Sequence, residues 1–338
     1  SQSDKEIKWK IRLKQSFENS ERIIGYFSSG STGEPKLIPV SSQMSFICHE
    51  KVINNFKNKN SIKNIICLHD NSFVISLNYV SLGLMMDISL LCLYDKNPLT
   101  FLYYLKKSSK ESLLISIPSF WEKISSFLIK KKFKIHSSIS CGEPLKWDTA
   151  KDIYKSSIHN CFNYYGATEF STWVFNFSID DLALEIRPKD EAYVPIGYPL
   201  NAVKTIISEE GELGINCKHM IRYYITQGYS LYKADIRKSY NKKEFLFTGD
   251  RACIKNKKFY CLGRKDGLVK VKGIFVDLFV IQEKVAIFLE MREFILVISN
   301  KQVIHLYINS KDLNDQEKLS IRNEIEKILF NNINEKIL

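Results

Sequence analysis

Short apolar runs and helix-like patterns take turns along the chain between residues 61 and 165. Consecutive apolar residues predict buried strands, and apolar residues three or four positions apart predict amphipathic helices. The predicted strands cover residues 62–68, 88–94, 113–117, 135–140 and 161–165, and the predicted helices cover 74–86, 98–107, 120–130 and 147–155. This alternation is typical of an α/β fold with a mainly parallel sheet and helices on both faces. Ligands bind such sheets at the carboxyl ends of the strands, where we expect all the candidate loops.

The pattern changes after Phe170, where strand-like runs separated by turn signals take over. These runs predict an antiparallel or barrel-like, β-rich subdomain. Its expected strands cover residues 203–208, 213–215, 220–225, 245–247 and 258–260.

The best domain boundary is the polar, glycine-flanked segment at residues 263–267. We therefore expect a core at residues 1–262, beginning with a polar helix or arm, and a small α+β C-terminal domain at residues 263–338. In that domain a mostly β stretch precedes a long amphipathic helix at about 313–330, which Asp312 or Asn314 caps.

The composition is that of a globular protein, with 45% hydrophobic and 25% charged residues. No apolar run is long enough to span a bilayer, and the polar start does not have the pattern of a signal peptide. None of the eight cysteines forms a Cys-x-x-Cys pair, so neither a zinc site nor a disulfide framework is indicated. Reduced, buried thiols are typical of a cytoplasmic protein.

The net charge of +12 suits partners that carry negative charge, such as nucleotide phosphates, an acidic carrier protein, an anionic membrane or nucleic acid. Nucleic acid is disfavoured because no basic–aromatic interleaving accompanies the charge. The alternative explanation is a composition bias, since Lys, Asn and Ile are abundant throughout the chain.

A hydroxyl-rich segment carries the clearest chemistry. Within ten residues lie four hydroxyl side chains, two glycines and a lysine: Ser28, Ser29, Gly30, Ser31, Thr32, Gly33 and Lys36. Glycines let backbone N–H groups surround an anion, and the hydroxyls and the lysine add donors and charge. The alternative is a surface linker. A predicted strand at 23–27 before the segment and a predicted helix at 42–56 after it favour a loop that binds phosphates.

Three further segments carry candidate chemistry, although each by itself also fits an ordinary turn. Tyr165, Gly166, Thr168 and Glu169 follow a predicted strand and offer a ring face for a base, a hydroxyl for phosphate and a carboxylate for Mg²⁺. Asp250 also follows a predicted strand, and its carboxylate can accept hydrogen bonds from both ribose hydroxyls.

The third segment is the turn at residues 140–145, which includes Cys141. A catalytic thiol at Cys141 is disfavoured, because no histidine is placed to activate it.

In their order along the chain, these segments resemble the motifs of the AMP-forming adenylating enzymes: acyl- and aryl-CoA ligases, adenylation domains of nonribosomal peptide synthetases, and luciferase. The resemblance covers most of the chain. It implies that Lys36 and the hydroxyl loop hold the phosphates of ATP, that Tyr165 stacks near adenine, that Thr168 contacts the AMP phosphate and that Glu169 ligates magnesium.

The resemblance also implies roles for residues outside these loops. The backbone of Gly142, Glu143 and Pro144 would line the adenine and acyl pockets, Asp250 would bind ribose, and Arg264 would contact ribose or phosphate. Asp266 would be the hinge about which the C-terminal domain rotates, and Lys336 is the candidate for the family's catalytic lysine.

The chain departs from the family pattern in several places. Phe275 stands where many relatives have Arg, Glu335 replaces the glycine before the family lysine, and only 26 residues precede the hydroxyl loop. An exposed terminal lysine is thus an alternative reading of Lys336.

The implied activity is ATP-dependent formation of an acyl-AMP from a carboxylic acid, followed by acyl transfer to a thiol of CoA or of an acidic carrier protein. The implied cofactors are ATP and Mg²⁺, with CoA as the alternative acceptor. The segment at 73–76 lacks the acid that binds an α-ammonium in amino-acid-activating relatives, so an apolar acyl or aryl acid is favoured. Two alternatives stay open: a non-catalytic relative that binds nucleotide or carrier protein, and a ligase with an amine acceptor.

Overall fold

The computed structural model describes most of the 338 residues. The described ranges are 23–29, 35–68, 75–93, 98–170, 172–184, 191–217, 220–221, 223–225, 231–233, 237–240, 243–271, 274–289, 294–298, 304–309 and 312–334.

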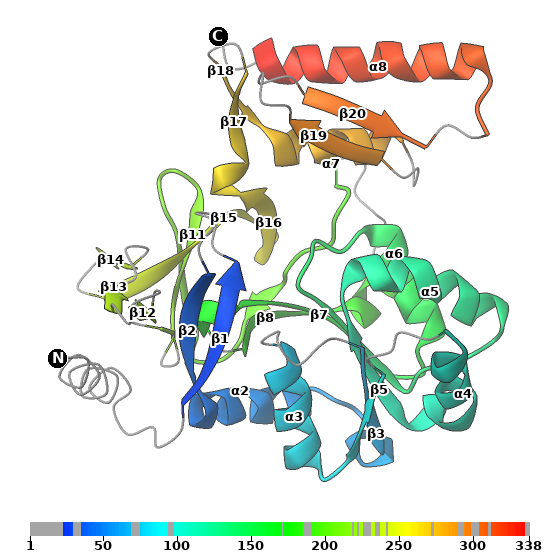
Figure 1. The fold of residues 1–338 in the computed structure, drawn as a ribbon, viewed down its shortest axis with the longest axis vertical. Helices are drawn as coiled ribbons and strands as arrows, with labels where there is room; N and C mark the ends of the chain where they lie inside the picture. The colour runs from blue at the N-terminus through cyan, green and yellow to red at the C-terminus, as the bar shows by residue number, and fades with distance from the viewer. Residues whose placement is uncertain are drawn as a thin grey trace.

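A seven-stranded sheet runs through the first half of the chain in the order β4-β3-β5-β6-β7-β8-β9 (Figure 1). Its strands are β3 (Asn64–Cys67), β4 (Ser89–Cys92), β5 (Ser112–Ser116), β6 (Ser137–Cys141), β7 (Cys161–Ala167), β8 (Thr172–Ser178) and β9 (Tyr198–Pro199). The first five strands of this order are parallel, and β8 and β9 add antiparallel pairs. The predicted, mainly parallel α/β sheet is therefore confirmed.

Helices cover both faces of this sheet, as the alternation predicts (Figure 1). They are α2 (Ser42–Asn54), α3 (Ile75–Met86), α4 (Pro98–Ser108), α5 (Pro118–Lys130) and α6 (Trp147–Ser156). Strand β5 shows the two faces directly. Leu114 packs with Trp121 and Trp147 of α5 and α6, whereas its neighbours Leu113 and Ile115 pack with residues of α2 and α3.

The hydroxyl loop does not belong to the parallel sheet, which corrects one expectation. It lies between β1 (Ile23–Ser29) and β2 (Pro35–Ser41), an antiparallel hairpin that precedes α2. This hairpin belongs to a separate sheet with β12 (Tyr223–Ile225) and β13 (Leu231–Lys233). The sequence predicts a strand, a loop and a helix here, without the second strand β2. That strand was missed because Pro35 and Pro39 weaken the strand signal of its segment.

The predicted β-rich subdomain is antiparallel. It contains β10 (Lys204–Ile207), β11 (Glu212–Asn216), β14 (Arg237–Tyr240), β15 (Lys243–Lys255) and β16 (Lys258–Arg264). Its core is shared with the other sheets, since Leu213 and Leu246 pack in one cluster with Phe175 of β8 and Ile38 of β2. The three sheets are therefore held together by one apolar core.

The last part of the chain forms β17 (Leu268–Val271), β18 (Ile274–Asp277), α7 (Leu278–Phe288), β19 (Phe294–Ile298), β20 (Ile304–Ile308) and α8 (Asp315–Asn334). These elements lie together at the top of Figure 1. They have a small core of their own, which includes Ile281, Val285 and Ile325. The domain division at residue 263 stays a prediction.

Helix α7 corrects the expectation of a mostly β stretch between residues 268 and 308. Apolar side chains surround most of this helix, so its sequence has the nearly continuous apolar pattern that is also typical of a buried strand. The helical signal is the spacing of Ile281, Val285 and Leu289, which are all buried.

Of the two predicted caps of α8, Asp312 and Asn314, the structure has Asn314. Its Oδ1 accepts the N–H of Glu317 at 2.9 Å, and the Glu317 carboxylate accepts the N–H of Asn314 at 2.9 Å.

Among the described helices, none combines the length and the apolar character that crossing a membrane requires.

The small core of α7 and α8 generates a stability prediction. Replacing Ile281, which is fully buried, with Ala removes apolar contacts and leaves a cavity, so we expect a loss of about 2–5 kcal/mol of local stability. Native-state hydrogen exchange of α8 amides measures this loss. Leu319→Ala on α8 is the control, because Leu319 is 59% exposed and lies outside this core. Equal effects of the two variants would contradict the proposed core.

Candidate active site

One pocket of about 310 Å³ gathers residues from four separate parts of the chain. They come from the turn after β6, from the end of β7, from residues 193–196 and from β15 and β16. Seven of the lining residues belong to the motifs singled out in the sequence: Gly142, Glu143, Pro144, Tyr165, Gly166, Asp250 and Arg264. The structure therefore brings these motifs to one place.

The turn after β6 presents its backbone to the pocket. Gly142 has φ +89°, a conformation that side chains other than glycine rarely adopt. The Glu143 carboxylate accepts the backbone N–H of Ser119 at 3.0 Å and the Ser119 hydroxyl at 3.2 Å, at the N-terminus of α5. A carboxylate is stabilised at a helix N-terminus. Glu143 thus anchors the turn through its side chain.

Tyr165 and Asp250 meet across the pocket. The Tyr165 hydroxyl donates a hydrogen bond of 2.5 Å to Oδ2 of Asp250. Burial, together with the negative charge of Asp250, raises the pKa of Tyr165 well above its ordinary value. The phenol therefore stays protonated and remains a donor, while the other carboxylate oxygen of Asp250 lies 3.4 Å from Nη1 of Arg264.

The segment Thr248-Gly249-Asp250 lies within β15 and not at its end, which corrects the expectation of a strand end. The strand pairing with β16 is irregular at this point, between Asp250 and Ala252. The Thr248 hydroxyl donates to the carbonyl of Leu213 at 3.2 Å and accepts the N–H of Asp250 at 3.0 Å. This bulged segment, residues 248–250, is hereafter called the ribose turn after the role predicted for Asp250, which it brings to the pocket.

Thr168 and Glu169 lie outside this pocket, in the short helix η3 (Thr168–Phe170). Helix η3 packs against β2, the strand that follows the hydroxyl loop. The Glu169 carbonyl accepts the N–H of Ile221 at 2.9 Å, which ties η3 to the segment before β12. The end of β7 therefore connects the pocket to the hairpin that carries the predicted phosphate loop.

The remaining predicted site residues are described only in part. Ser28 and Ser29 pair with Lys36 and Pro35 at the end of the hairpin next to its connecting loop. Asp266 lies in η5 (Lys265–Gly267), directly after β16. Ser31, Thr32 and Lys336 lie outside the described residues.

Within the described ranges, no three His, Cys, Asp or Glu side chains are grouped to hold a metal ion. A single carboxylate such as Glu169 fits Mg²⁺, which is commonly held by one or two carboxylates together with phosphate oxygens and water.

Several lining residues were missed by the sequence reasoning, including Asn163, Tyr193, Val194, Ile196 and Cys261. Asn163 could have been found, because it lies two positions before Tyr165 on the same face of β7. Its amide donates to the carbonyl of Pro195 at 3.1 Å, which holds the 193–196 segment beside the pocket. That segment itself has no motif, so only the tertiary structure places it.

The eight cysteines, all within the described residues, form no disulfide. Cys141 is buried beside the pocket, and burial raises the pKa of its thiol to about 12. Such a thiol is protonated at neutral pH, as the expectation of buried thiols requires. The expectation of burial holds for four thiols, whereas Cys48, Cys253 and Cys261 are half-buried and Cys92 is exposed.

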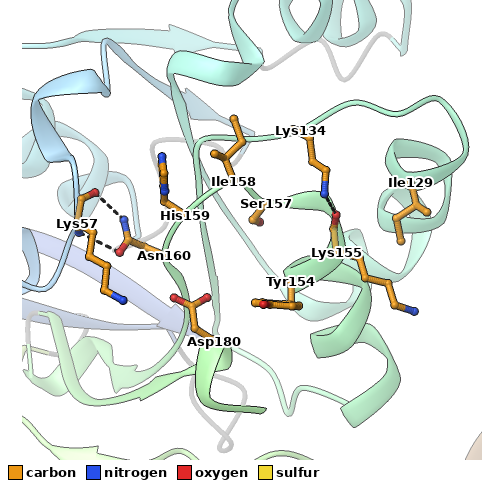
Figure 2. A pocket seen from close by; sticks show the side chains of 10 residues that line it. All are labelled: Lys57, Ile129, Lys134, Tyr154, Lys155, Ser157, Ile158, His159, Asn160 and Asp180. Atoms are coloured by element: carbon orange, nitrogen blue, oxygen red, sulfur yellow. Dashed lines mark hydrogen bonds between the residues drawn. The ribbon is translucent and has the colours of Figure 1, made fainter. Parts of the chain in front are cut away.

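A second, larger pocket of about 690 Å³ contains none of the predicted site residues (Figure 2). Its lining includes Lys57, Lys134, Tyr154 and Asp180. Residues 157–160 in its wall precede β7, so it lies at the amino ends of the parallel strands, opposite to the edge where ligands of such sheets bind. Asn160 and the Lys57 backbone exchange two hydrogen bonds of 2.9 Å there (Figure 2).

Solved structures with the same fold support the architecture. NpsA of Klebsiella oxytoca, in complex with 3-hydroxyanthranilyl-AMSN, aligns with a TM-score of 0.72 at 16% identity over 91% of this chain and 64% of its own. The O-succinylbenzoate coenzyme A synthetase MenE of Bacillus subtilis, in complex with ATP and magnesium ion, aligns with a TM-score of 0.66 at 14% identity over 89% of this chain and 62% of its own.

Similarity is also found at the level of sequence. The D-alanine–D-alanyl carrier protein ligase of Staphylococcus aureus is 23% identical, over 92% of this chain and 66% of its own length. The chain thus spans between 62% and 66% of the lengths of these three proteins. The family model described as AMP-binding enzyme matches residues 3–217, which is more than half of the 338 residues. The chain therefore belongs to the AMP-binding enzyme family.

Proposed function

We propose that the chain activates a carboxylic acid with ATP, forming an acyl-AMP and pyrophosphate, and then transfers the acyl group to a thiol. The observation that carries this proposal is the single pocket lined by Gly142, Tyr165, Asp250 and Arg264, which come from four separate segments singled out in the sequence. Within this pocket, the Tyr165 ring, the Asp250 carboxylate and the Arg264 guanidinium suit the base, the ribose and the phosphate of one nucleotide.

In the first step, an oxygen of the substrate carboxylate attacks the α-phosphorus of ATP, and the bond to the pyrophosphate oxygen breaks. The chain needs no nucleophile for this step, so catalysis is positioning and stabilisation of charge. Asp250 accepts the ribose hydroxyls, and the backbone of residues 142–144 borders the base. Tyr165 holds Asp250 in place through its hydroxyl.

The phosphates are assigned to the hairpin and to η3, which pack against each other. The N–H and hydroxyl groups of the hydroxyl loop and the ammonium of Lys36 bind the leaving pyrophosphate, and Thr168 binds the α-phosphate. Glu169 would hold Mg²⁺, which when bound offsets the negative charge of the phosphate oxygens.

In the second step, a thiol attacks the acyl carbonyl carbon, and AMP leaves with its phosphate oxygen. The acceptor is CoA or the phosphopantetheine of a carrier protein. The names of the relatives include both a carrier protein ligase and a coenzyme A synthetase. A basic chain attracts an acidic carrier. We assign residues 263–338 to a C-terminal domain that rotates about Asp266 between the two steps.

The acid is assigned to the apolar acyl or aryl class, because residues 73–76 contain no carboxylate for an α-ammonium. The carrier protein ligase relative is named for D-alanine, so amino acids belong in any substrate panel. The alternatives are a binding module without catalysis and a ligase with an amine acceptor. An amide product in place of a thioester identifies the latter.

ATP–pyrophosphate exchange over a panel of fatty, aryl and amino acids tests the function. We expect exchange with at least one acid, and a loss of about 100-fold in Lys36→Ala, because a charge on the leaving pyrophosphate is removed. Lys204→Ala is the control, since Lys204 is an exposed lysine of β10. Absence of exchange with every acid would favour the binding module.

Lys336→Ala separates the two readings of the terminal lysine. If Lys336 is the family lysine, adenylate formation falls strongly while transfer from a supplied acyl-AMP to the thiol is retained, because the lysine acts only on the first step. Single-turnover measurements of both steps make this comparison. Unchanged adenylate formation would assign Lys336 to an exposed terminus.

Cys141→Ser tests whether a protein thiol takes part. Because burial raises the pKa of Cys141 to about 12, its thiolate is scarce below pH 9. We expect the serine variant to retain exchange activity within about threefold, and the pH profile of the wild type to show no thiol titration below pH 9. A loss of two orders of magnitude would instead assign Cys141 to catalysis.

A further inference from the structure

Glu212, the first residue of β11, connects two functional segments that the family motifs treat separately. Its side chain is buried, with 7% of the residue exposed. Oε1 accepts the backbone N–H of Gly249 at 3.0 Å, and Oε2 accepts a hydrogen bond from Nζ of Lys265 at 3.3 Å. Gly249 is the centre of the ribose turn, and Lys265 immediately precedes the predicted hinge residue Asp266.

The ribose turn is held from two sides. Glu212 binds the N–H of Gly249 on one side, and Nη1 of Arg264 donates to the carbonyl of Thr248 at 2.8 Å on the other. Gly249 has φ +75°, and a Cβ at this position would lie 2.6 Å from a guanidinium nitrogen of Arg264. The position of Asp250 therefore depends on Arg264, which lines the pocket, and also on Glu212, which is not among the lining residues.

The hinge side of Glu212 is an ion-pair cluster. Lys265 also donates to the carboxylate of Glu210, in the turn before β11. The Glu210 side chain is 67% exposed, so its pair with Lys265 contributes little. The Glu212 side chain is only 9% exposed, and removing Lys265 would leave a buried carboxylate with less compensation. A rotation of the segment after β16 away from β11 has to break this second pair.

We propose that Glu212 is a positioning residue that couples the ribose turn to the hinge: Oε1 keeps Asp250 in its nucleotide-binding position, and Oε2 holds Lys265, and with it the hinge, in the present orientation. This inference rests on the proposed function for its effect on the two steps, but the two contacts themselves do not depend on it.

The two contacts can be separated by substitution. Glu212→Ala removes both. Glu212→Gln keeps an oxygen that accepts the Gly249 N–H but loses the charge that pairs with Lys265, and Lys265→Met removes only the hinge contact. Lys204→Met is the matched control, since it also removes one charge from an exposed lysine, but on β10.

Hydrogen exchange of the full chain without ligand reads the contacts directly. We expect Glu212→Ala to accelerate exchange of the Gly249 amide and of the amides in residues 264–267 by about 10-fold, since hydrogen bonds to a charged group are lost. Glu212→Gln and Lys265→Met should accelerate only the 264–267 amides. Unchanged exchange of those amides in Lys265→Met, relative to Lys204→Met, would overturn the hinge contact.

Steady-state kinetics test whether Glu212 couples the ribose turn to the hinge. We expect Glu212→Ala to raise KM for ATP about 10-fold with a smaller change in kcat of exchange, and Glu212→Gln to restore KM to within about twofold of the wild type. In Glu212→Gln and Lys265→Met, the rate of thioester formation relative to adenylate formation should change at least threefold. A KM in Glu212→Gln as high as in Glu212→Ala would overturn the proposed role of Oε1.

The failure of this inference differs from a failure of the proposed function. If the wild type exchanges pyrophosphate with no acid, the proposed activity fails, and the hydrogen-exchange comparison still decides whether Glu212 holds both segments. If the wild type is active but Lys265→Met and Lys204→Met behave alike in both measurements, the coupling fails alone. Should Glu212→Ala not fold, Glu212→Gln and Lys265→Met still carry the hinge comparison.

Discussion

The hydrogen bond between Tyr165 and Asp250 joins two parts of the molecule that the chain builds separately. Tyr165 belongs to β7 of the parallel sheet, and Asp250 belongs to β15 of the antiparallel sheet. Because burial and the nearby carboxylate keep the phenol protonated, the bond persists as a donor–acceptor pair at neutral pH. The pocket lies where these two sheets meet, so this contact also defines one of its walls.

Close backbone approach between β7 and β8 fixes the end of β7 that carries Tyr165. A Cβ at Gly166, the residue after Tyr165, would lie 2.4 Å from the carbonyl oxygen of Thr172 on β8. The Thr172 hydroxyl lies in a buried polar group with His49 and Asn78, in which Nε2 of His49 is 2.7 Å from Oδ1 of Asn78. The end of β7 thus lies in close backbone contact with β8, and hydrogen bonds among Thr172, His49 and Asn78 hold that part of β8 in place. A larger residue at position 166 would clash with the backbone of β8 and so displace Tyr165, without any contact between the new side chain and a ligand.

The sequence predicts the parallel sheet well because each of its elements is local. Strand β5 at Ser112–Ser116, for example, differs by one residue at each end from its predicted range. The errors occur where distant pairing or context decides. Strand β2 contains two prolines and is stabilised by pairing with β1 and β12, and α7 is apolar on nearly all sides. In both cases the local pattern is ambiguous, and the tertiary structure resolves it.

The same division applies to the pocket. Motif residues such as Gly142 and Asp250 were recognisable because their chemistry is tied to a short local pattern, whereas Tyr193 and Val194 line the pocket from a segment without any motif. Glu212 lies between these cases, since it directly precedes a predicted strand but its partners, Gly249 and Lys265, are far from it in the sequence. Spacing along a chain cannot reveal which backbone N–H a buried carboxylate accepts.

The core shared by the three sheets places a further constraint on the site. Ile38 of β2, Phe170 of η3, Phe175 of β8 and Leu213 of β11 pack in one buried cluster. Ile38 lies two residues after Lys36, Phe170 directly follows Glu169, and the Phe175 ring packs edge-on against Tyr165, so this cluster adjoins predicted phosphate, magnesium and base contacts. The relative positions of those contacts therefore follow from apolar packing, which is dense and resists deformation. Loss of volume in this cluster would move the predicted contact residues relative to one another even though none of them is altered, because the cluster joins elements of all three sheets.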